Sequence, residues 1–415
     1  MTSEIKQRIE QIRRGEVPEG YVKTALGLAP ANWKRYTFGD IYTERKEPGD
    51  ENLPLLMVSI HSGVSDGEVD AAELPKQVKR IEDKSQYKKA VSGDLVFNMM
   101  RAWQGAIGTV RTTGMVSPAY IAAEPNDKVY PLFMDYYSRT PQMINQIDRQ
   151  SYGVTDFRKR LYWDSFAPIS CTLPPIEEQQ KIAAILTTQD KVIELKEKRL
   201  AEKQRQKKYF MQQLLTGKKR LPGFNGAWKT DCLDKLFFER KETNCENIEM
   251  LAITGTQGII PRKELDLKDN SSEDKSKYLR VCVGDIGYNT MRMWQGVSAY
   301  SNYEGIVSPA YTILKPSSSI NAKYFAYLFK MSEIVFLFYR FSQGLVDDTR
   351  NLKYENFKKI KVYYPPDIKE QTAIAEVLSA ADREIELLQQ DIEQEKQKKK
   401  ALMQLLLTGI VRVTV

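Results

Sequence analysis

The sequence of 415 residues is poor in the side chains that most often bind metals or carry out catalysis. Its one histidine, His61, excludes a metal site built from paired histidines, and we expect this residue on a loop or at the surface. The four cysteines lie far apart without Cys-x-x-Cys spacing, which indicates reduced thiols in a cytoplasmic protein rather than a zinc site. We therefore expect this chain to bind no metal.

Long apolar runs and phosphate-binding motifs are missing as well. No run reaches membrane-spanning length, and the stretch MTSEIKQRIEQIRRGE has no apolar core, so we expect neither a membrane anchor nor a secretory signal. The sequence has no G-x-x-x-x-G-K-[ST] phosphate loop, no glycine fingerprint of a dinucleotide-binding fold and no Asn-Pro-Pro-aromatic motif of adenine methyltransferases. Glu-Arg-Lys triplets at 44–46 and 239–241 resemble part of a nuclease motif, but no aspartate on an apolar strand precedes them. These absences argue against an enzyme.

The sequence contains enough apolar residues for more than one hydrophobic core, and it carries a net positive charge. Apolar residues make up 42% of the chain, and its length exceeds what one hydrophobic core usually organises, which predicts at least two domains. The 62 lysines and arginines outnumber the 54 aspartates and glutamates, for a net charge of +8. This surplus favours an anionic partner such as nucleic acid.

An internal repeat divides the chain into two halves. Residues 93–120, GDLVFNMMRAWQGAIGTVRTTGMVSPAY, align without a gap with residues 284–311, GDIGYNTMRMWQGVSAYSNYEGIVSPAY, at an offset of 191. Upstream, TERKE matches FERKE and Trp33 matches Trp228 at an offset of 195, and downstream MQQLLTG matches MQLLLTG. Because the offset changes so little, we infer that the two halves are homologous and differ by short insertions.

Each half begins with a mixed globular segment. In the first half, strand-like runs cover 53–60, 94–100 and 116–123, and a helix-like stretch covers 131–147. The second half has the corresponding helix-like stretch at 322–341. The mixture of strands and helices predicts an α+β head in each half.

A double proline then predicts the end of a strand and the beginning of a long helix in each half. Apolar residues at three-to-four spacing, with no proline or glycine between them, predict helices over about 176–217 and 368–409, with Gly217 and Gly409 at their C-terminal caps. At 1.5 Å per residue each helix would be roughly 60 Å long, which is more than one small domain covers. An ordinary amphipathic helix packed on its own domain is the alternative interpretation.

The order of the elements predicts how the two helices pair. The first helix leaves the first globular segment and ends where the second segment begins, so a second helix paired with it must run in the opposite direction. Residues 9–21, IEQIRRGEVPEGY, resemble residues 211–224, MQQLLTGKKRLPGF, at the end of the first helix. We therefore expect the N-terminal fragment to lie against the end of the second helix and to close the chain into a pseudo-two-fold circular arrangement.

The segments NMMRAWQG and NTMRMWQG of the repeat are the candidate DNA-binding motifs. Arginine and glutamine can form paired hydrogen bonds with guanine and adenine edges, which makes them candidate base readers. The candidates are Asn98, Arg101, Gln104, Asn289, Arg292 and Gln295. Alternatively, Trp103 and Trp294 are core aromatics with an arginine stacked over each ring, and the motif is scaffold.

Four further cations, in the TERKE and FERKE segments, are candidates for phosphate contacts. They are Arg45, Lys46, Arg240 and Lys241. For each of them, a solvated surface charge is the alternative interpretation.

The segments at the ends of the two long helices resemble the spacer helices of type I restriction–modification specificity (S) subunits. The resemblance rests on LPPIEEQQKIAAIL followed by MQQLLTGKKRLPGF, and on PPDIKEQTAIAEVL followed by MQLLLTG. It spans the whole chain and implies an α+β fold of two homologous mixed α/β target-recognition domains, separated by two long antiparallel spacer helices that form a coiled coil. The implied boundaries are an N-terminal helix fragment at 1–19, recognition domains at 20–172 and 218–363, and spacer helices at 173–217 and 364–415.

The resemblance also implies a function and a set of partners. Such a subunit binds double-stranded DNA with an asymmetric bipartite sequence, one half-site per recognition domain, and has no catalytic activity of its own. Two methyltransferase (M) subunits would dock on the spacer helices and carry S-adenosylmethionine. Restriction (R) subunits would join through the M subunits and use ATP and Mg, so this chain itself would bind no cofactor. The complex would be cytoplasmic, in a prokaryote, without contact to a membrane.

Two other classes of function remain open from the residues alone. One is a coiled-coil scaffold whose globular ends bind proteins, and the other is a hidden nuclease or methyltransferase. If the chain reads DNA, positions identical in both heads are expected to be scaffold, phosphate contacts or readers of a base that both half-sites share. Discrimination between half-sites is expected where the heads differ, as in 61–80 against 256–275.

Overall fold

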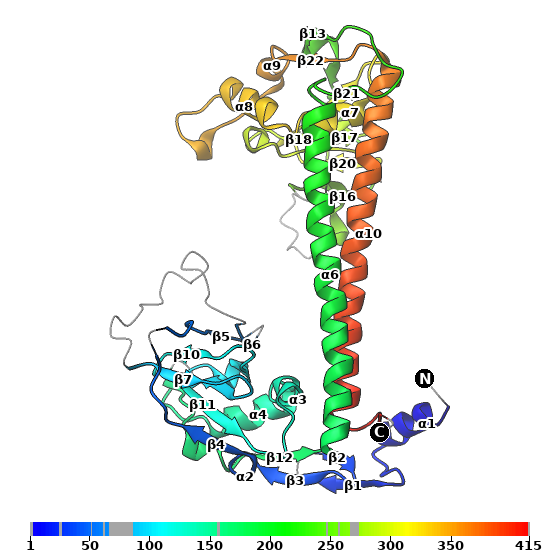
Figure 1. The fold of residues 1–415 in the computed structure, drawn as a ribbon. Helices are drawn as coiled ribbons and strands as arrows, with labels where there is room; N and C mark the ends of the chain where they lie inside the picture. Colours follow the sequence, from blue (N-terminus) through cyan, green and yellow to red (C-terminus); the bar gives the residue numbers. More distant parts are fainter. Residues whose placement is uncertain are drawn as a thin grey trace. The chain divides into compact units, whose positions relative to one another are not determined.

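The computed structural model divides the chain into two compact units (Figure 1). One unit is Met1–Leu195 with Ile392–Val415, and the other is Lys196–Asp391, so each holds one α/β head and parts of both long helices. The described residues are 3–24, 27–50, 52–60, 63–65, 86–155, 158–245, 248–255, 258–265 and 274–413. His61 and large parts of 61–80 and 256–275, where the sequence predicts base discrimination, lie outside the described residues.

The head of the first unit is built on a four-stranded antiparallel sheet of order β4-β11-β8-β9. Its strands are β4 (Tyr42–Arg45), β11 (Tyr120–Pro125), β8 (Leu95–Asn98) and β9 (Ile107–Thr109). All residues of β8 and β9 are buried, so both faces of the sheet are covered there. Two-stranded ribbons accompany the sheet: β1 (Tyr21–Thr24) with β2 (Gly27–Pro30), β3 (Lys34–Thr37) with β12 (Ser170–Leu173), β5 (Val58–Ser59) with β6 (Gly63–Val64), and β7 (Lys88–Ala90) with β10 (Gly114–Val116).

The strand predictions for this head are confirmed at β8, which lies inside the predicted run 94–100. In the run 53–60, only Val58–Ser59 forms a strand. The run 116–123 belongs to two strands, β10 and β11, because the chain turns between them and the N–H of Tyr120 bonds back to the carbonyl of Ser117 at 2.9 Å.

The prediction of one helix over 131–147 is wrong, because the stretch forms two helices, α3 (Pro131–Tyr137) and α4 (Pro141–Gln150). A residue that precedes proline is disfavoured in helical conformation, and Thr140 is extended, with φ −66° and ψ 148°. Its hydroxyl instead accepts the N–H of Met143 and caps α4. The remaining helical segments of this unit's head and N-terminus are α1 (Ser3–Arg13), α2 (Phe38–Ile41), α5 (Trp163–Phe166) and the 3-10 turn η2 (Ala102–Gln104).

The head of the second unit repeats this architecture, with the strand order β14-β21-β18-β19. The sheet strands are β14 (Phe237–Glu239), β21 (Tyr311–Pro316), β18 (Ile286–Asn289) and β19 (Ser298–Tyr300). The ribbons pair β13 (Lys229–Cys232) with β22 (Lys361–Tyr364), β15 (Leu251–Ile253) with β16 (Ile259–Pro261), and β17 (Leu279–Val281) with β20 (Gly305–Val307). Its helical segments are α7 (Ala322–Leu328), α8 (Ser332–Phe341), α9 (Tyr354–Phe357), η4 (Leu233–Lys235), η5 (Arg262–Glu264), η6 (Met293–Gln295) and η7 (Asp347–Thr349). The predicted single helix over 322–341 is therefore also two helices.

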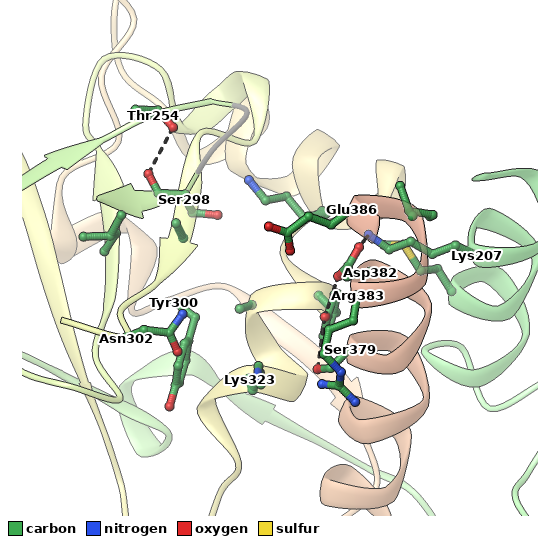
Figure 2. Close-up of a pocket in the computed structure, with 18 of the residues that line it drawn as sticks. Lys207, Thr254, Ser298, Tyr300, Asn302, Lys323, Ser379, Asp382, Arg383 and Glu386 are labelled. Atoms are coloured by element: carbon green, nitrogen blue, oxygen red, sulfur yellow. Dashed lines mark hydrogen bonds and ion pairs between the residues drawn. The ribbon is translucent and has the colours of Figure 1, made fainter. Parts of the chain in front are cut away.

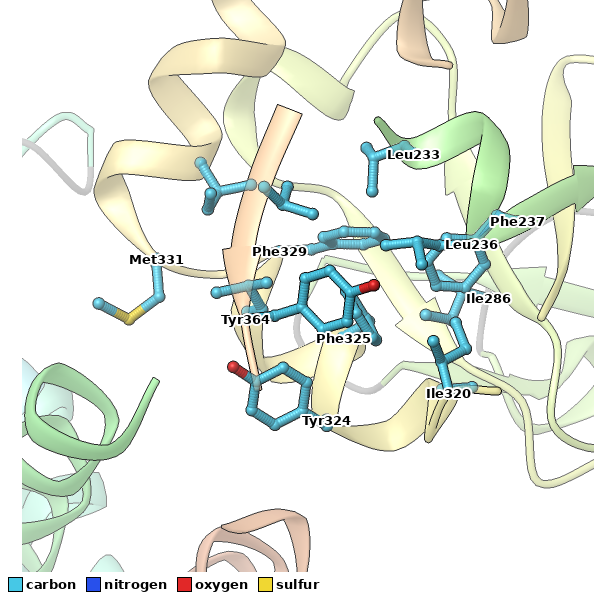
Figure 3. Packing of buried hydrophobic residues seen from close by; sticks show 14 of the residues in the cluster. Leu233, Leu236, Phe237, Ile286, Ile320, Tyr324, Phe325, Phe329, Met331 and Tyr364 are labelled. Carbon is cyan, nitrogen blue, oxygen red and sulfur yellow. The ribbon is translucent and has the colours of Figure 1, made fainter. Parts of the chain in front are cut away.

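Aromatic rings pack against one another in the core of the second head (Figure 3). Phe325 of α7 lies edge-on to Phe237 of β14, with ring centroids 5.4 Å apart, and Phe329 lies edge-on to Phe338 of α8 at the same separation. Such pairs contribute about 0.5–1.5 kcal/mol each beyond the burial of their area. The aromatic contacts therefore fix α7 against the sheet and α8 against the residue that follows α7.

The two predicted long helices are confirmed as α6 (Ile176–Leu214) and α10 (Ile368–Leu407). Beyond their ends, Gly217 and Gly409 have φ angles of +72° and +71°, the left-handed conformation of a C-terminal cap. Within the described ranges, no helix combines the length and the apolarity that crossing a bilayer requires.

Within each unit, α6 and α10 run antiparallel, because residue numbers fall in one helix as they rise in the other. The ion pairs are Lys196–Asp391, Lys203–Glu384 and Lys207–Asp382 in the second unit, and Asp190–Lys399 in the first. Exposed pairs of this kind stabilise little individually, but their order along the helices fixes the direction and the register of the packing.

A buried carboxylate joins the beginning of each long helix to the segment beyond the end of the other. Glu178 of α6 accepts two hydrogen bonds from the guanidinium of Arg412, both of 2.7 Å. Glu370 of α10 is held in the same way by Arg220, with a distance of 2.7 Å from Nη2 to Oε2. Both glutamates are 1% exposed. The paired hydrogen bonds compensate the charge of each buried carboxylate.

A tyrosine of each head anchors the head to the helix pair. In the first unit, the Tyr136 hydroxyl donates to Asp190 Oδ2 at 2.6 Å, and Lys399 of the opposite helix pairs with the same carboxylate. Burial, followed by the bond to Asp190, raises the pKa of Tyr136, so its hydroxyl keeps its proton and remains a donor. The equivalent set in the second unit is Tyr327, Asp382 and Lys207.

The buried junction gives a prediction about stability. We expect Glu370→Gln to lower the free energy of unfolding by about 2 kcal/mol, because the guanidinium of Arg220 loses its charged partner at a buried position. The matched control is Glu355→Gln, which breaks a pair with Lys358 whose glutamate is 69% exposed, and which we expect to change the stability by less than about 1 kcal/mol. Urea titration of the full chain measures both, and equal effects of the two changes would contradict the prediction.

Candidate nucleic-acid interface

The repeated Arg-x-Trp-Gln-Gly segments form the same turn in both heads. In the first head, the segment leaves β8, forms η2 and enters β9, and in the second head it leaves β18, forms η6 and enters β19. The closing glycines have φ angles of +105° for Gly105 and +80° for Gly296, which few other residues adopt. Each turn lies against the second helix of its own head, α4 or α8. The sequence repeat is therefore a repeat of backbone geometry.

The asparagines and tryptophans of the motif serve this turn. The Asn98 side-chain oxygen accepts the N–H of Met100 at 2.9 Å, and the Trp103 indole N–H donates to the carbonyl of Met100 at 3.0 Å. The second head repeats both bonds at 2.9 Å, with Asn289, Trp294 and Met291. These side chains hold the turn closed, although both tryptophans are only half-buried.

The cation over the first of these rings is not the arginine that the scaffold interpretation names. Lys159 lies over the ring of Trp103, with its Nζ 4.9 Å from the centroid. The ring of Trp294 instead meets Tyr339 edge-on, at 6.2 Å. The arginine of the motif is thus left out of the packing in both heads.

The arginine and the glutamine of each motif point outward. The four residues are Arg101, Gln104, Arg292 and Gln295, and all are exposed. In the described part of the chain, none of these side chains forms a hydrogen bond or an ion pair with the protein. Both motifs therefore present one guanidinium and one carboxamide on a fixed turn.

The arginines of TERKE and FERKE lie in a different environment. Arg45 is 9% exposed and binds Asp94 through Nε at 2.7 Å and Nη2 at 3.0 Å, while its Nη1 binds Glu47. The bond to Asp94 raises the pKa of Arg45 above its ordinary value, so this arginine stays charged. The second head repeats the cluster with Arg240, Asp285 and Glu242. These guanidinium groups bind carboxylates of their own head, and the geometry gives no support to a phosphate contact by them.

The lysines beside them are exposed. The side chain of Lys46 is 82% exposed and lies 3.6 Å from Glu44, and that of Lys241 is 75% exposed and lies 3.0 Å from Glu239. Ion pairs at such exposure are weak, so both ammonium groups are available to an anion.

A hollow of about 1000 Å³ lies in the second unit between the head and the long helices (Figure 2). Lys323, Arg383 and Glu386 are among the residues that line it. At the same place in the first head, the buried Asp135 binds the N–H of Thr109 and the guanidinium of Arg139. The second head has alanine, Ala326, at the position of Asp135, and Ala326 lines the hollow. Among the described residues, no group of three or more histidine, cysteine or acidic side chains could hold a metal ion.

Sequence reasoning missed a loop that adjoins the motif in each head. The loop follows α4 in the first head and α8 in the second. Its C-terminal end bonds to residues around the motif: Leu161 N–H to the carbonyl of Met99 at 2.9 Å, and Leu352 N–H to that of Thr290 at 2.8 Å. A search for the repeat at offset 191 could have found it, because Ser-Tyr-Gly-Val at 151–154 matches Ser-Gln-Gly-Leu at 342–345.

The two environments of arginine give a second prediction. We expect Arg240→Ala to destabilise the chain by about 3 kcal/mol, because it leaves the carboxylate of Asp285 buried without its partner. We expect Arg292→Ala to change the stability by less than about 0.5 kcal/mol, because the side chain is exposed and unbonded. Urea unfolding curves measure the difference, and a large loss on Arg292→Ala would show that this arginine supports the fold.

Comparison with known proteins places the chain in a family. The sequence model described as the type I restriction modification DNA specificity domain matches residues 79–204 and 235–397, more than half of the chain. In Methanocaldococcus jannaschii, the putative type I restriction enzyme MjaX specificity subunit is 24% identical over 95% of this chain and 97% of its own length. The type I restriction enzyme MjaVIII specificity subunit of the same organism is 25% identical over 79% of this chain and 83% of its own length.

Solved structures of low sequence identity share the fold. The S subunit of a type I restriction–modification system from M. genitalium has a TM-score of 0.56 at 11% identity, with 92% of this chain and 97% of that chain covered. A chain from a study of complex assembly and conformational transition of the type I R-M system has a TM-score of 0.53 at 16% identity, with coverages of 92% and 99%. The resemblance found in the sequence is thereby confirmed, and the chain belongs to the family of type I restriction–modification specificity subunits.

Proposed function

We propose that this chain is the subunit that selects the DNA sequence for a type I restriction–modification complex. It binds an asymmetric bipartite target, one half-site to each head, and directs partner methyltransferase and restriction subunits to that target without catalysis of its own. The observation that carries this proposal is the pair of outward-facing arginine–glutamine sets on identical turns of two homologous heads. Family membership supports the same function.

The chemistry of the two turns suits duplex DNA. A guanidinium can donate two hydrogen bonds to O6 and N7 of guanine, and a carboxamide can pair with N6 and N7 of adenine. The turn that carries Arg101 and Gln104 is held by Asn98 and Trp103, so little backbone entropy is lost when the side chains bind. Lys46 and Lys241 are proposed phosphate contacts, because they are exposed.

The proposed organisation follows the repeat. Recognition domains occupy 20–172 and 218–363, and the spacer helices at 173–217 and 364–415 form a coiled coil with pseudo-two-fold symmetry. The fragment 1–19 completes the repeat beside the end of the second spacer helix. This is supported by the Tyr21 hydroxyl, which donates to the carbonyl of Gly409 at 2.6 Å, and by Arg8, which lies 3.4 Å from the carbonyl of Ile410.

The proposed partners dock on the spacer helices. Two methyltransferase subunits would bind there and hold S-adenosylmethionine, and restriction subunits would join through them and use ATP and Mg, in the cytoplasm of a prokaryote. Leu195 of α6 and Leu387 of α10 occupy equivalent positions and are 53% and 65% exposed. Equivalent exposed leucines on two helices suit the docking of two copies of one partner.

The proposed function predicts sequence-selective binding. The complex of this chain with its methyltransferase partner should bind one bipartite duplex far more tightly than random duplex, with an affinity that falls steeply as salt rises. Single-molecule sequencing of DNA methylated by the complex gives both half-sites and the gap between them. Exchange of residues 218–363 for those of another family member should change one half-site only. A complex that binds every duplex equally would instead favour a protein scaffold.

The roles of individual residues can be separated in the same complex. We expect Arg292→Ala to weaken binding of the specific duplex about tenfold or more and to relax the choice of one base, since it removes a paired hydrogen bond. We expect Lys241→Ala to weaken specific and random duplexes alike and to lower the salt slope by about one. If the half-sites share no base and Arg101→Ala and Arg292→Ala leave selectivity intact, the motif is scaffold only.

A further inference from the structure

The loop beside each motif carries an apolar residue at its tip. The described residues of the loop are 151–155 and 158–162 in the first head and 342–353 in the second. Its tip residue is Val154 in one head and Leu345 in the other, which are 90% and 100% exposed. A single exposed apolar residue is ordinary, but here the same exposure recurs at the same position of two homologous loops.

The base of the loop is fixed in both heads. Tyr152 and Arg160 exchange backbone hydrogen bonds of 3.1 and 2.9 Å, and Gln343 and Asn351 exchange bonds of 2.8 and 2.7 Å. At the preceding serine, the hydroxyl bonds back to the last turn of the helix in each case, at 2.8 and 2.7 Å. Ladder bonds and helix cap together hold the direction of the loop.

The glycine before the tip allows the two sides of the loop to approach closely. A Cβ on Gly153 would lie 2.4 Å from the carbonyl oxygen of Arg158, and one on Gly344 would lie 2.6 Å from that of Thr349. Gly344 also has a φ of +135°. The narrow loop therefore displays its apolar tip away from the head.

The loop is continuous with the proposed reading turn. Besides the backbone bonds of Leu161 and Leu352, a cation from the return side of each loop packs onto an aromatic ring of the head: Lys159 on Trp103, and Arg350 on Tyr339 at 4.0 Å. Tyr339 in turn contacts Trp294 of the second motif. A ligand held by the arginine and glutamine of a motif is thus bound beside the loop of the same head.

The charge of the first loop favours DNA as that ligand. Its return side reads Arg158-Lys159-Arg160, whereas in the second loop Arg350 and Lys353 are balanced by Asp347 and Asp348, and Arg350 pairs with Asp347 at 3.1 Å. Proteins that bind the minor groove combine such cations with an apolar side chain that enters between base pairs.

We propose that Val154 and Leu345 are wedge residues, each of which enters the duplex at its own half-site and separates one pair of stacked bases. The proposal rests on the proposed function, since it deepens the same interface. Unstacking costs a few kcal/mol per step, and burial of the apolar side chain together with the contacts of the neighbouring turn offsets this cost. Selectivity then includes the ease with which a step opens, in addition to hydrogen bonds with base edges.

The test uses the complex with the methyltransferase partner and a duplex of the sequence found by methylation sequencing. 2-Aminopurine replaces single bases of the second half-site outside the methylated adenine, and its fluorescence rises where stacking is lost. We expect one position to brighten with the unaltered complex and to stay dark with Leu345→Ser. We also expect Leu345→Ser to weaken binding of the specific duplex about tenfold or more and to change binding of random duplex less than about twofold.

Matched variants control this experiment. Val283→Ser removes an apolar side chain that is 62% exposed elsewhere in the second head, and it should change neither signal. Val154→Ser should act in the same way as Leu345→Ser, but on the first half-site. The wedge would be overturned if Leu345→Ser changed neither the affinity nor the fluorescence. It would also be overturned if size-exclusion chromatography showed that Leu345→Ser abolishes binding of the methyltransferase partner while DNA binding stays intact. Failure of the unaltered complex to prefer any bipartite duplex would instead overturn the proposed function.

Discussion

The pairing of the two long helices depends on two buried carboxylates, Glu178 and Glu370. Each accepts hydrogen bonds from an arginine that follows the end of the other long helix. An unpaired carboxylate at 1% exposure would be costly, so the arginine that follows one long helix stabilises the beginning of the other. This contact pairs segments that lie far apart in the chain.

Comparison of the two homologous heads separates the residues that hold the structure from the residues proposed to contact bases. Asn98 and Trp103, with their counterparts Asn289 and Trp294, hold identical turns, and Arg45 and Arg240 hold identical carboxylate clusters. The geometry of the turn thus explains why most of the motif is identical in both heads. Only the outward arginine and glutamine are left unexplained by packing, which is why the proposed base contacts are confined to them.

The sequence predicted the elements whose signals are local, and it was less informative where distant residues decide. The long helices, their glycine caps, the strand β8 and the two homologous heads follow from periodicity, prolines and the repeat. The break at Thr140-Pro141 could have been predicted from the proline alone, whereas the break before Ser332 has no proline to mark it. The partner of Arg45 is Asp94, which is 49 residues away, and no sequence pattern connects the two. The loop tips escaped notice because exposure is a property of the fold.

The tyrosine–aspartate–lysine sets have a consequence for how the chain holds together. In each set, a single carboxylate receives the hydroxyl of one head and the ammonium of the opposite helix, and that helix belongs to the other repeat. The packing of a head on the long helices is therefore thermodynamically linked to the pairing of those helices. A repeat taken alone would lack the lysine that pairs with its own anchor, so each half of the chain completes the anchor of the other.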